Sequence, residues 1–191
     1  GSYSESCALK NYPNCETISC KTFDECFEMA NKDNQVKAII PESNKTTGNI
    51  GVEYLIFKYR LNIYAEHFFP IKHNLLGIKG SSLDIIKNVY SHAQALSQSS
   101  KFIRKNNLIE NVRADTAGSA KYISDTNDKT KAAIASSLSA EIYNLEILKK
   151  DIQDEKNNFT RFLLMGQEIL QPELKDDSYI TSFLFKLKSK P

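Results

Sequence analysis

With 191 residues, 41% of them hydrophobic, the chain is long enough to bury a substantial core as one globular domain or as two small lobes. Its 25 basic and 23 acidic side chains leave a formal charge of +2 spread along the sequence, which predicts no basic face for nucleic acid. No apolar run approaches the ~20 residues of a bilayer span and no signal peptide is recognisable, so we expect a cytoplasmic protein without a membrane partner.

The four cysteines all lie within the first 26 residues, which raises the question of a metal cluster or a disulfide. No two of them form a Cys-x-x-Cys pair, and no histidine lies near them, so the usual zinc frameworks are not matched. We therefore expect no metal and interpret the following residues as small buried hydrophobes in a reducing compartment: Cys7, Cys15, Cys20 and Cys26.

Strand-like and helix-like segments alternate along the chain, which predicts an α/β fold. Thr22 and Glu25 have the spacing of a capping box, so a helix is expected to begin at residue 21 or 22. The remaining segments of this half are predicted as a strand at 36–40 closed by Pro41, a polar loop at 42–51, a helix at 52–61, strands at 63–69 and 71–78, and a short helix from Ser82 to about Lys87.

The middle of the chain repeats one arrangement three times, in which a short apolar strand leads into a helix that opens on small polar residues. The strands are expected at 89–90, 112–114 and 132–135, and the helices open at Ser91 and His92, at Asp115, Thr116, Ala117 and Gly118, and at Ser136 and Ser137. Free backbone N–H groups at helix starts favour a bound carboxylate or phosphate. Simple capping is the alternative for any one junction, but three together favour a binding cleft at the carboxyl ends of the strands.

One arginine and one threonine interrupt the apolar, strand-like run at residues 157–164. A half-buried arginine keeps its charge, so Arg161 is expected to hold an anion or a carboxylate. Thr160 is placed to donate a hydrogen bond or a proton to the molecule that carries this anion. Among the histidines, His67 and His73 lie in apolar or aromatic stretches and are interpreted as structural, while His92 is a candidate site residue.

Six motifs, in order along the chain, resemble those of the catalytic domain of prephenate dehydratases. They are residues 1–5 (GSYSE), the loop at 40–48, residues 91–98 (SHAQALSQ), 115–120 (DTAGSA), 132–141 (AAIASSLSAE) and 157–162 (NNFTRF). The Thr160, Arg161 and Phe162 triplet is the most diagnostic of them. The resemblance covers nearly the whole chain.

The resemblance implies a two-lobed α/β fold like type II periplasmic binding proteins, with the active site in the cleft between the lobes. We expect residues 1–69 and 163–177 in the first lobe and 70–158 in the second. The implied reaction converts prephenate to phenylpyruvate with loss of carbon dioxide and water, without a cofactor. By the same analogy Thr160 acts on the departing hydroxyl, Phe162 forms the wall near the ring, and the other substrate contacts are Arg161, Asn44, Ser91, His92, Gln94, Thr116, Ala117 and Gly118.

The chain also departs from the family pattern. Ser43 stands at the usually acidic position of the loop. Either Glu42 substitutes for this acid through a backbone shift, or Lys45 adds a second cation to the cleft. Ala93 replaces the usual proline after Ser91 and His92. The strand expected before GSYSE is missing, and residues 180–188 resemble the opening strand of a regulatory ACT domain. We therefore expect phenylalanine to act as an allosteric effector only of the full-length protein, which we expect to be a homo-oligomer, either a dimer or a tetramer.

Two alternatives to prephenate dehydratase remain. Arogenate dehydratase uses the same chemistry on the amino-acid analogue, and Glu42 or Asp115 are candidates for the acid that its ammonium group needs. The second alternative is a module that binds a small carboxylate without catalysis.

Overall fold

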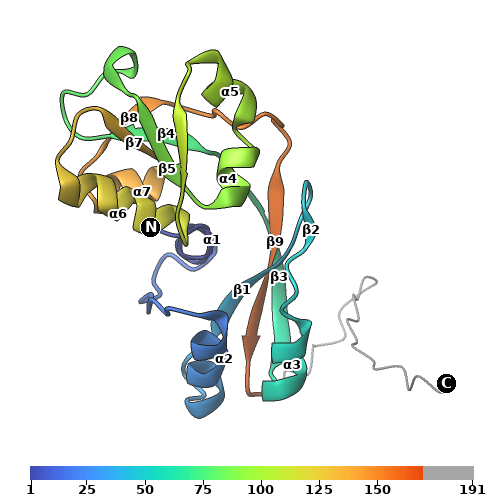
Figure 1. Ribbon diagram of the computed structural model, residues 1–191. Helices are drawn as coiled ribbons and strands as arrows, with labels where there is room; N and C mark the ends of the chain where they lie inside the picture. The colour runs from blue at the N-terminus through green and yellow to red at the C-terminus, as the bar shows by residue number, and fades with distance from the viewer. Residues whose placement is uncertain (170–191) are drawn as a thin grey trace. The chain divides into compact units, whose positions relative to one another are not determined.

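The computed structural model describes residues 1–169, whose elements are labelled in Figure 1. The chain divides into two units, which are taken separately below. Unit 1 contains Gly1–Cys15 and Pro70–Phe159, and unit 2 contains Glu16–Phe69 and the described residues from Thr160 onward. The expected ACT strand at 180–188, and residues 170–177 of the expected first lobe, lie outside the described residues.

The first segment does not join the rest of the expected first lobe, because its contacts are with unit 1. The hydroxyls of Ser136 and Ser139 both donate to the Gly1 carbonyl at 2.7 Å. The Tyr3 hydroxyl donates to the Lys72 carbonyl at 2.9 Å. These bonds and helix α1 (Tyr3–Asn11) place residues 1–15 in unit 1 rather than with residues 16–69.

Unit 1 is built on a five-stranded sheet in the order β6-β5-β7-β4-β8. The strands are β4 (Asn74–Gly77), β5 (Asn88–Ser91), β6 (Ile109–Val112), β7 (Lys131–Ala135) and β8 (Glu146–Lys149). β5 is parallel to β6 and β7, whereas β4 is antiparallel to β7 and β8. Because β5, β6 and β7 run in the same direction, their carboxyl ends and the helix starts that follow them share one edge of the sheet.

Helices cover both faces of this sheet (Figure 1). α4 (Ala93–Ser97) and α5 (Ser100–Lys105) contribute Leu96 and Ile103 to one core cluster, which contains Leu75 of β4. α6 (Thr116–Thr126) and α7 (Ser137–Ile142) contribute to the other cluster, which contains the next residue of β4, Leu76. Since successive strand residues face opposite sides, a sheet buried on both faces needs such continuous apolar runs. A short 3₁₀ helix, Leu83–Ile85, precedes β5.

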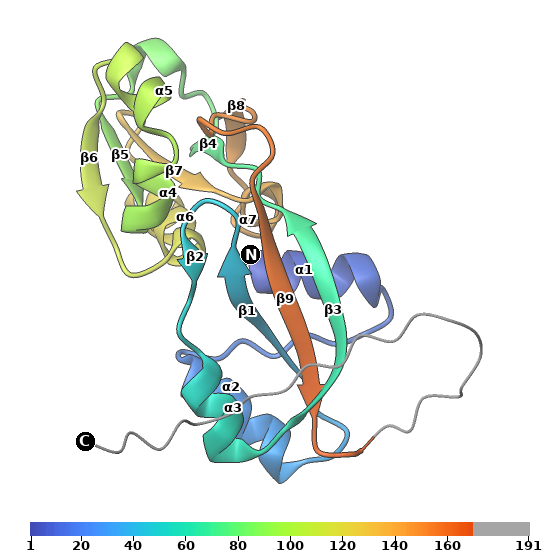
Figure 2. The same ribbon diagram turned by 90° about the vertical axis from the view of Figure 1, so that its right-hand side faces the viewer.

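Unit 2 has a four-stranded sheet in the order β2-β1-β9-β3, shown in Figure 2. The strands are β1 (Ala38–Asn44), β2 (Gly48–Asn49), β3 (Asn62–Pro70) and β9 (Phe159–Gly166), and β1 is antiparallel to both β2 and β9. Two helices, α2 (Phe23–Lys32) and α3 (Glu53–Tyr59), contribute Phe27 and Leu55 to a core cluster with Ile40 and Leu163. The apolar side chains of β1 and β9 are therefore covered by these helices.

Several elements differ in detail from those expected. The Thr22 cap of α2 is confirmed, because its hydroxyl accepts from the Glu25 N–H at 3.1 Å. Pro41 does not end its strand: β1 continues to Asn44 through a register shift between Pro41 and Ser43, a bulge at which a missing N–H is tolerated. The helix expected after Ser91 is divided into α4 and α5. None of the helices within residues 1–169 is long and apolar enough to cross a membrane.

Candidate active site

Strand β9 places Thr160 and Arg161 on opposite faces of the unit 2 sheet, because successive side chains of a strand alternate. Thr160 lies across from Asn44, and both side chains are buried. Arg161 lies across from Ser43, on the face that carries the core residue Leu163 two positions further along. The two side chains therefore face opposite sides of the sheet, and the expectation that they act on one ligand stays a prediction.

The Thr160 hydroxyl is held by the side chain of Asn44, whose Nδ2 donates to Thr160 Oγ1 at 2.9 Å. The other end of the amide, Oδ1, accepts from the N–H and the hydroxyl of Thr46 at 2.9 and 2.6 Å. It also accepts from the N–H of Thr47 at 3.3 Å. These donors fix which end of the amide faces Thr160. Since Thr160 Oγ1 accepts from Asn44, its own proton remains available for donation to another group.

Arg161 is paired with two carboxylates of its own unit. Its Nε donates to Glu66 Oε2 at 2.7 Å, and its Nη1 donates to Glu42 Oε2 at 3.2 Å. Burial lowers the pKa of the guanidinium, but the hydrogen bonds and charges of Glu66 and Glu42 outweigh this effect, so the pKa is raised. A half-buried arginine does hold a carboxylate here, as expected, but the carboxylates are internal. The expected contact between Arg161 and a substrate carboxylate stays a prediction beside these internal pairs.

Ser43, at which the loop departs from the family pattern, contacts the same ion-pair group. The Ser43 hydroxyl donates to Glu42 Oε2 at 2.6 Å, so Glu42 accepts from both Ser43 and Arg161. Ser43 thus supports the carboxylate beside it. Glu42 is engaged inside unit 2 and is not an isolated acid.

Phe162 follows on the same face as Thr160 and is 1% exposed. Its ring packs edge-on against Phe69, with the ring centroids 6.3 Å apart and the planes at 86°. The buried ring of Phe162 therefore packs within unit 2 and stabilises the position of β9. The role of Phe162 as the wall near the substrate ring stays a prediction.

At the start of α4, which follows strand β5 of unit 1, one candidate site residue is buried and one is exposed. Ser91 is fully buried, and its hydroxyl donates to the Ile134 carbonyl at 2.6 Å, which joins β5 to β7. Ser91 therefore has a structural role. His92 is exposed and caps α4, because its Nδ1 accepts from the Gln94 N–H at 3.3 Å. With Nδ1 as the acceptor, the neutral ring carries its proton on Nε2.

The other two openings on this edge are also capped by side chains. Asp115 accepts from the Gly118 N–H at 2.6 Å, and Ser136 accepts from the Ser139 N–H at 3.0 Å. Capping, the simpler interpretation, thus applies at all three openings. Thr116 and Ala117 complete the first turn of α6, and their backbone N–H groups are among those that a helix cannot pair internally.

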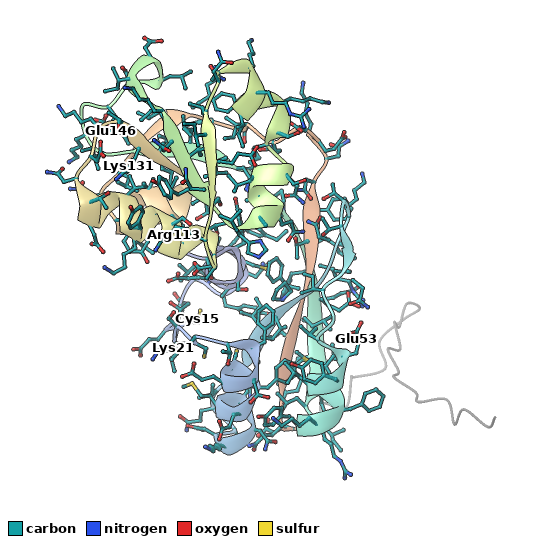
Figure 3. The ribbon with its side chains drawn as sticks, viewed as in Figure 1. Cys15, Lys21, Glu53, Arg113, Lys131 and Glu146 are labelled. Atoms are coloured by element: carbon teal, nitrogen blue, oxygen red, sulfur yellow. The ribbon has the colours of Figure 1, made fainter. Side chains whose placement is uncertain are left out.

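A hollow of about 210 Å³ lies beside this first turn, lined by Val112, Arg113, Ala114, Asp115 and Gly118. Arg113, labelled beside α6 in Figure 3, lies with its guanidinium carbon 4.2 Å from the centroid of the Tyr122 ring. Sequence reasoning missed this residue. Arg113 lies in the sequence between the end of a strand and the start of a helix, where anions are favoured. A cation at such a position was the signal that would have identified it.

His73 is a structural residue, in agreement with its interpretation from sequence. It is 2% exposed, its Nδ1 lies 2.7 Å from the Tyr3 hydroxyl, and its Nε2 lies 2.9 Å from Gln98 Oε1. The Asn158 amide donates to the same oxygen at 3.1 Å. Burial lowers the pKa of His73, and the hydrogen bond to Gln98 offsets part of this shift. The ring is therefore held neutral within a buried polar network.

The cysteines differ in burial, although all four were expected inside. Cys7 is buried, Cys20 and Cys26 are half-buried, and Cys15 is exposed. The expectation of a buried hydrophobe thus holds only for Cys7. Within residues 1–169, no three histidine, cysteine or acidic side chains are grouped closely enough to hold a metal ion.

A family model described as prephenate dehydratase matches residues 1–169. A curated relative from Arabidopsis thaliana, "Arogenate dehydratase/prephenate dehydratase 1, chloroplastic", is 41% identical over 194 residues, covering 100% of this chain and 49% of that protein. The chain thus spans about half the length of the curated relatives it matches.

Two solved structures share the fold. The prephenate dehydratase of Arthrobacter aurescens in complex with L-Phe has a TM-score of 0.82 at 23% identity, covering 92% of this chain and 60% of that one. A protein described as GqqA, a novel type of quorum quenching acylase, has a TM-score of 0.82 at 30% identity, covering 90% of this chain and 62% of that one. The expected α/β fold is confirmed by these likenesses.

Proposed function

Because the chain belongs to the prephenate dehydratase family, we propose that it carries the active site of a dehydratase that converts prephenate to phenylpyruvate in phenylalanine biosynthesis. The enzyme would be a carbon–oxygen lyase. The single observation that supports this best is the buried Thr160 hydroxyl, which Asn44 holds as an acceptor while its proton stays available.

The chemistry asks little of the protein beyond positioning. When prephenate loses carbon dioxide and its ring hydroxyl, the ring becomes aromatic, so the main requirement is to help hydroxide depart. Thr160 would donate to this departing hydroxyl. A threonine is a weak acid in water, and its contribution would come from fixed orientation and exclusion of water. The amide of Asn44 supplies the orientation, because it occupies one lone pair of Oγ1 and thereby restricts the direction of the O–H bond.

Prephenate carries two carboxylates, and the proposed contacts for them lie on unit 1. They are the Nε2–H of His92, the side chain of Gln94, and the backbone N–H groups that open α6 at Thr116 and Ala117. The Gly118 N–H already donates to Asp115, so Gly118 contributes through the shape of the turn. Arg161, Ser91 and Phe162 are assigned supporting roles, because internal groups of their own unit already occupy them.

Arogenate is the second candidate substrate, because the Arabidopsis relative is named for both activities. Its ammonium group would need an acidic partner, for which the sequence offered Glu42 and Asp115. Glu42 accepts from Arg161 and Ser43, and Asp115 caps α6. Because both acids are already engaged within the protein, prephenate, which has no ammonium group, remains the first candidate.

The decisive experiment incubates the purified protein separately with prephenate and with arogenate. Phenylpyruvate is measured by its absorbance in alkali, and phenylalanine is measured by chromatography. Prephenate turnover supports the first candidate, and phenylalanine formed from arogenate supports the second. Saturable binding of either compound without product would instead support a non-catalytic binding module.

Two substitutions at Thr160 test the residue itself. Thr160→Ser keeps the hydroxyl and is expected to retain most turnover, whereas the near-isosteric Thr160→Val removes the donor and is expected to lower kcat by about 100-fold or more. Circular dichroism of both variants serves as the control for folding. A kcat for Thr160→Val within a few-fold of the parent would remove Thr160 from the mechanism.

Regulation and assembly are proposed here as properties of the full-length protein. We propose phenylalanine as its allosteric effector, in line with the L-Phe complex named for the Arthrobacter aurescens enzyme. A homo-oligomer, dimer or tetramer, stays a prediction. The cytoplasmic location also stays a prediction, beside an Arabidopsis relative whose name is chloroplastic.

A further inference from the structure

Arg113 is an exposed arginine of unit 1 that lines the hollow of about 210 Å³ beside α6. Its backbone N–H donates to the Ser91 carbonyl at 2.8 Å, which fixes the residue at the end of β6. Within residues 1–169 its guanidinium forms no ion pair with an acidic side chain, whereas the guanidinium of Arg161 forms two. The charge of Arg113 is therefore left for a ligand.

The ring of Tyr122 holds this guanidinium in place. The guanidinium carbon lies 4.2 Å from the ring centroid, within the range of a cation–π contact. Tyr122 is half-buried on α6, and its own ring contacts Tyr90 of β5, with the centroids 5.1 Å apart. An aromatic ring attracts the charge without accepting conventional hydrogen bonds, so the N–H fork of Arg113 stays free to pair with the two oxygens of a carboxylate.

Two further charged groups near the hollow are already engaged. The carboxylate of Asp115, which lines the same hollow, caps the start of α6. Lys131, labelled with Arg113 in Figure 3, pairs through its Nζ with Asp128 Oδ2 at 3.3 Å. Of these three charged groups, Arg113 is the one without an internal partner, and the ligand that it suits is an anion.

Resting on the function proposed above, we propose that Arg113 binds the side-chain carboxylate of the substrate, which persists in the product. Prephenate loses its ring carboxylate as carbon dioxide, and a guanidinium paired with that group would stabilise the ground state against its departure. The carboxylate of the pyruvyl side chain takes no part in bond breaking. It is therefore the group that a fixed cation can hold in substrate, transition state and product alike.

This assignment gives Arg113 a role in binding that is separate from the chemical step. A contact that is equally strong in the substrate and in the transition state lowers KM and leaves kcat unchanged. Because phenylpyruvate keeps the same carboxylate, Arg113 should contribute to product binding by the same factor. Thr160, by contrast, is proposed to act on the departing hydroxyl and to affect kcat.

The test compares Arg113→Gln with Arg104→Gln, which removes the same charge from an exposed position on α5. Arg113→Gln should raise KM for the substrate that is turned over, prephenate or arogenate, by about tenfold. Titration calorimetry should show phenylpyruvate binding weakened by a similar factor, while kcat stays within about twofold. Arg113→Lys keeps the charge but loses the fork, so it should fall between parent and Arg113→Gln. Arg104→Gln should leave all three constants at the parent values.

The outcomes separate this proposal from the proposed function. An unchanged KM together with an unchanged phenylpyruvate affinity in Arg113→Gln would overturn the role of Arg113 and leave the dehydratase function standing. A lower kcat at the parent KM would also count against it, because the contact would then be made in the transition state alone. Failure of the parent to turn over prephenate or arogenate would refute the proposed function instead. The calorimetric titration would then decide alone: binding that depends on Arg113 supports its role, and no binding to the parent refutes it.

Discussion

Replacing Arg161 with methionine separates a structural arginine from a substrate-binding one. The change keeps an unbranched side chain of similar length but leaves the carboxylates of Glu66 and Glu42 without their shared cation. Removing one partner of a buried pair costs about 3–5 kcal/mol. Because these carboxylates are 26% and 19% exposed, water screens part of this cost, and we expect about 2–3 kcal/mol.

The assay is urea unfolding followed by circular dichroism, together with steady-state kinetics on prephenate. With a denaturant slope of about 1–3 kcal/mol per molar urea, the midpoint should fall by about 1 M. Arg161 faces away from Thr160, so KM should stay within about threefold of the parent value. Adding Glu66→Gln to Arg161→Met should recover part of the stability, since one stranded charge is removed.

The opposite pattern would contradict a purely structural role of Arg161. An Arg161→Met variant that unfolds at the parent's urea concentration while KM rises by about 100-fold would show that the arginine binds substrate. The internal pair with Glu66 and Glu42 would then be exchanged for the substrate carboxylate during binding.

Asn44→Ala should lower kcat about tenfold or more with a smaller change in KM, because Thr160 loses the donor that orients it; an unchanged kcat would contradict this role. Burial lowers the pKa of His73, so below about pH 6.5 the unfolded chain binds a proton that the folded chain does not, and stability should fall as the pH decreases. In urea titrations His73→Gln should flatten this dependence, and an equally steep dependence would exclude His73 as its source. Ser91→Ala should cost about 1–2 kcal/mol of unfolding free energy, since the Ile134 carbonyl loses its donor, and an unchanged urea midpoint would contradict this.

Local patterns were sufficient where structure depends on neighbouring residues. The Thr22 cap, the helix starts that follow the strands of unit 1 and the structural, hydrogen-bonded His73 were predicted correctly, because capping and periodicity act over a few residues. Pro41 was misread as the end of a strand, since a bulge that tolerates it depends on the partner strand β9.

Local sequence patterns did not identify the residues that contact Arg161 and Thr160. That Arg161 requires an anion follows from its charge and its apolar surroundings, and the sequence indicated this alone. Which anion it meets was decided by the pairing of β9 with its neighbours, which brings Glu66, 95 positions away, to the guanidinium. The same pairing brings Asn44, 116 positions away, to Thr160. Residues so distant meet according to strand register and the alternation of side chains, and neither is encoded within a single segment.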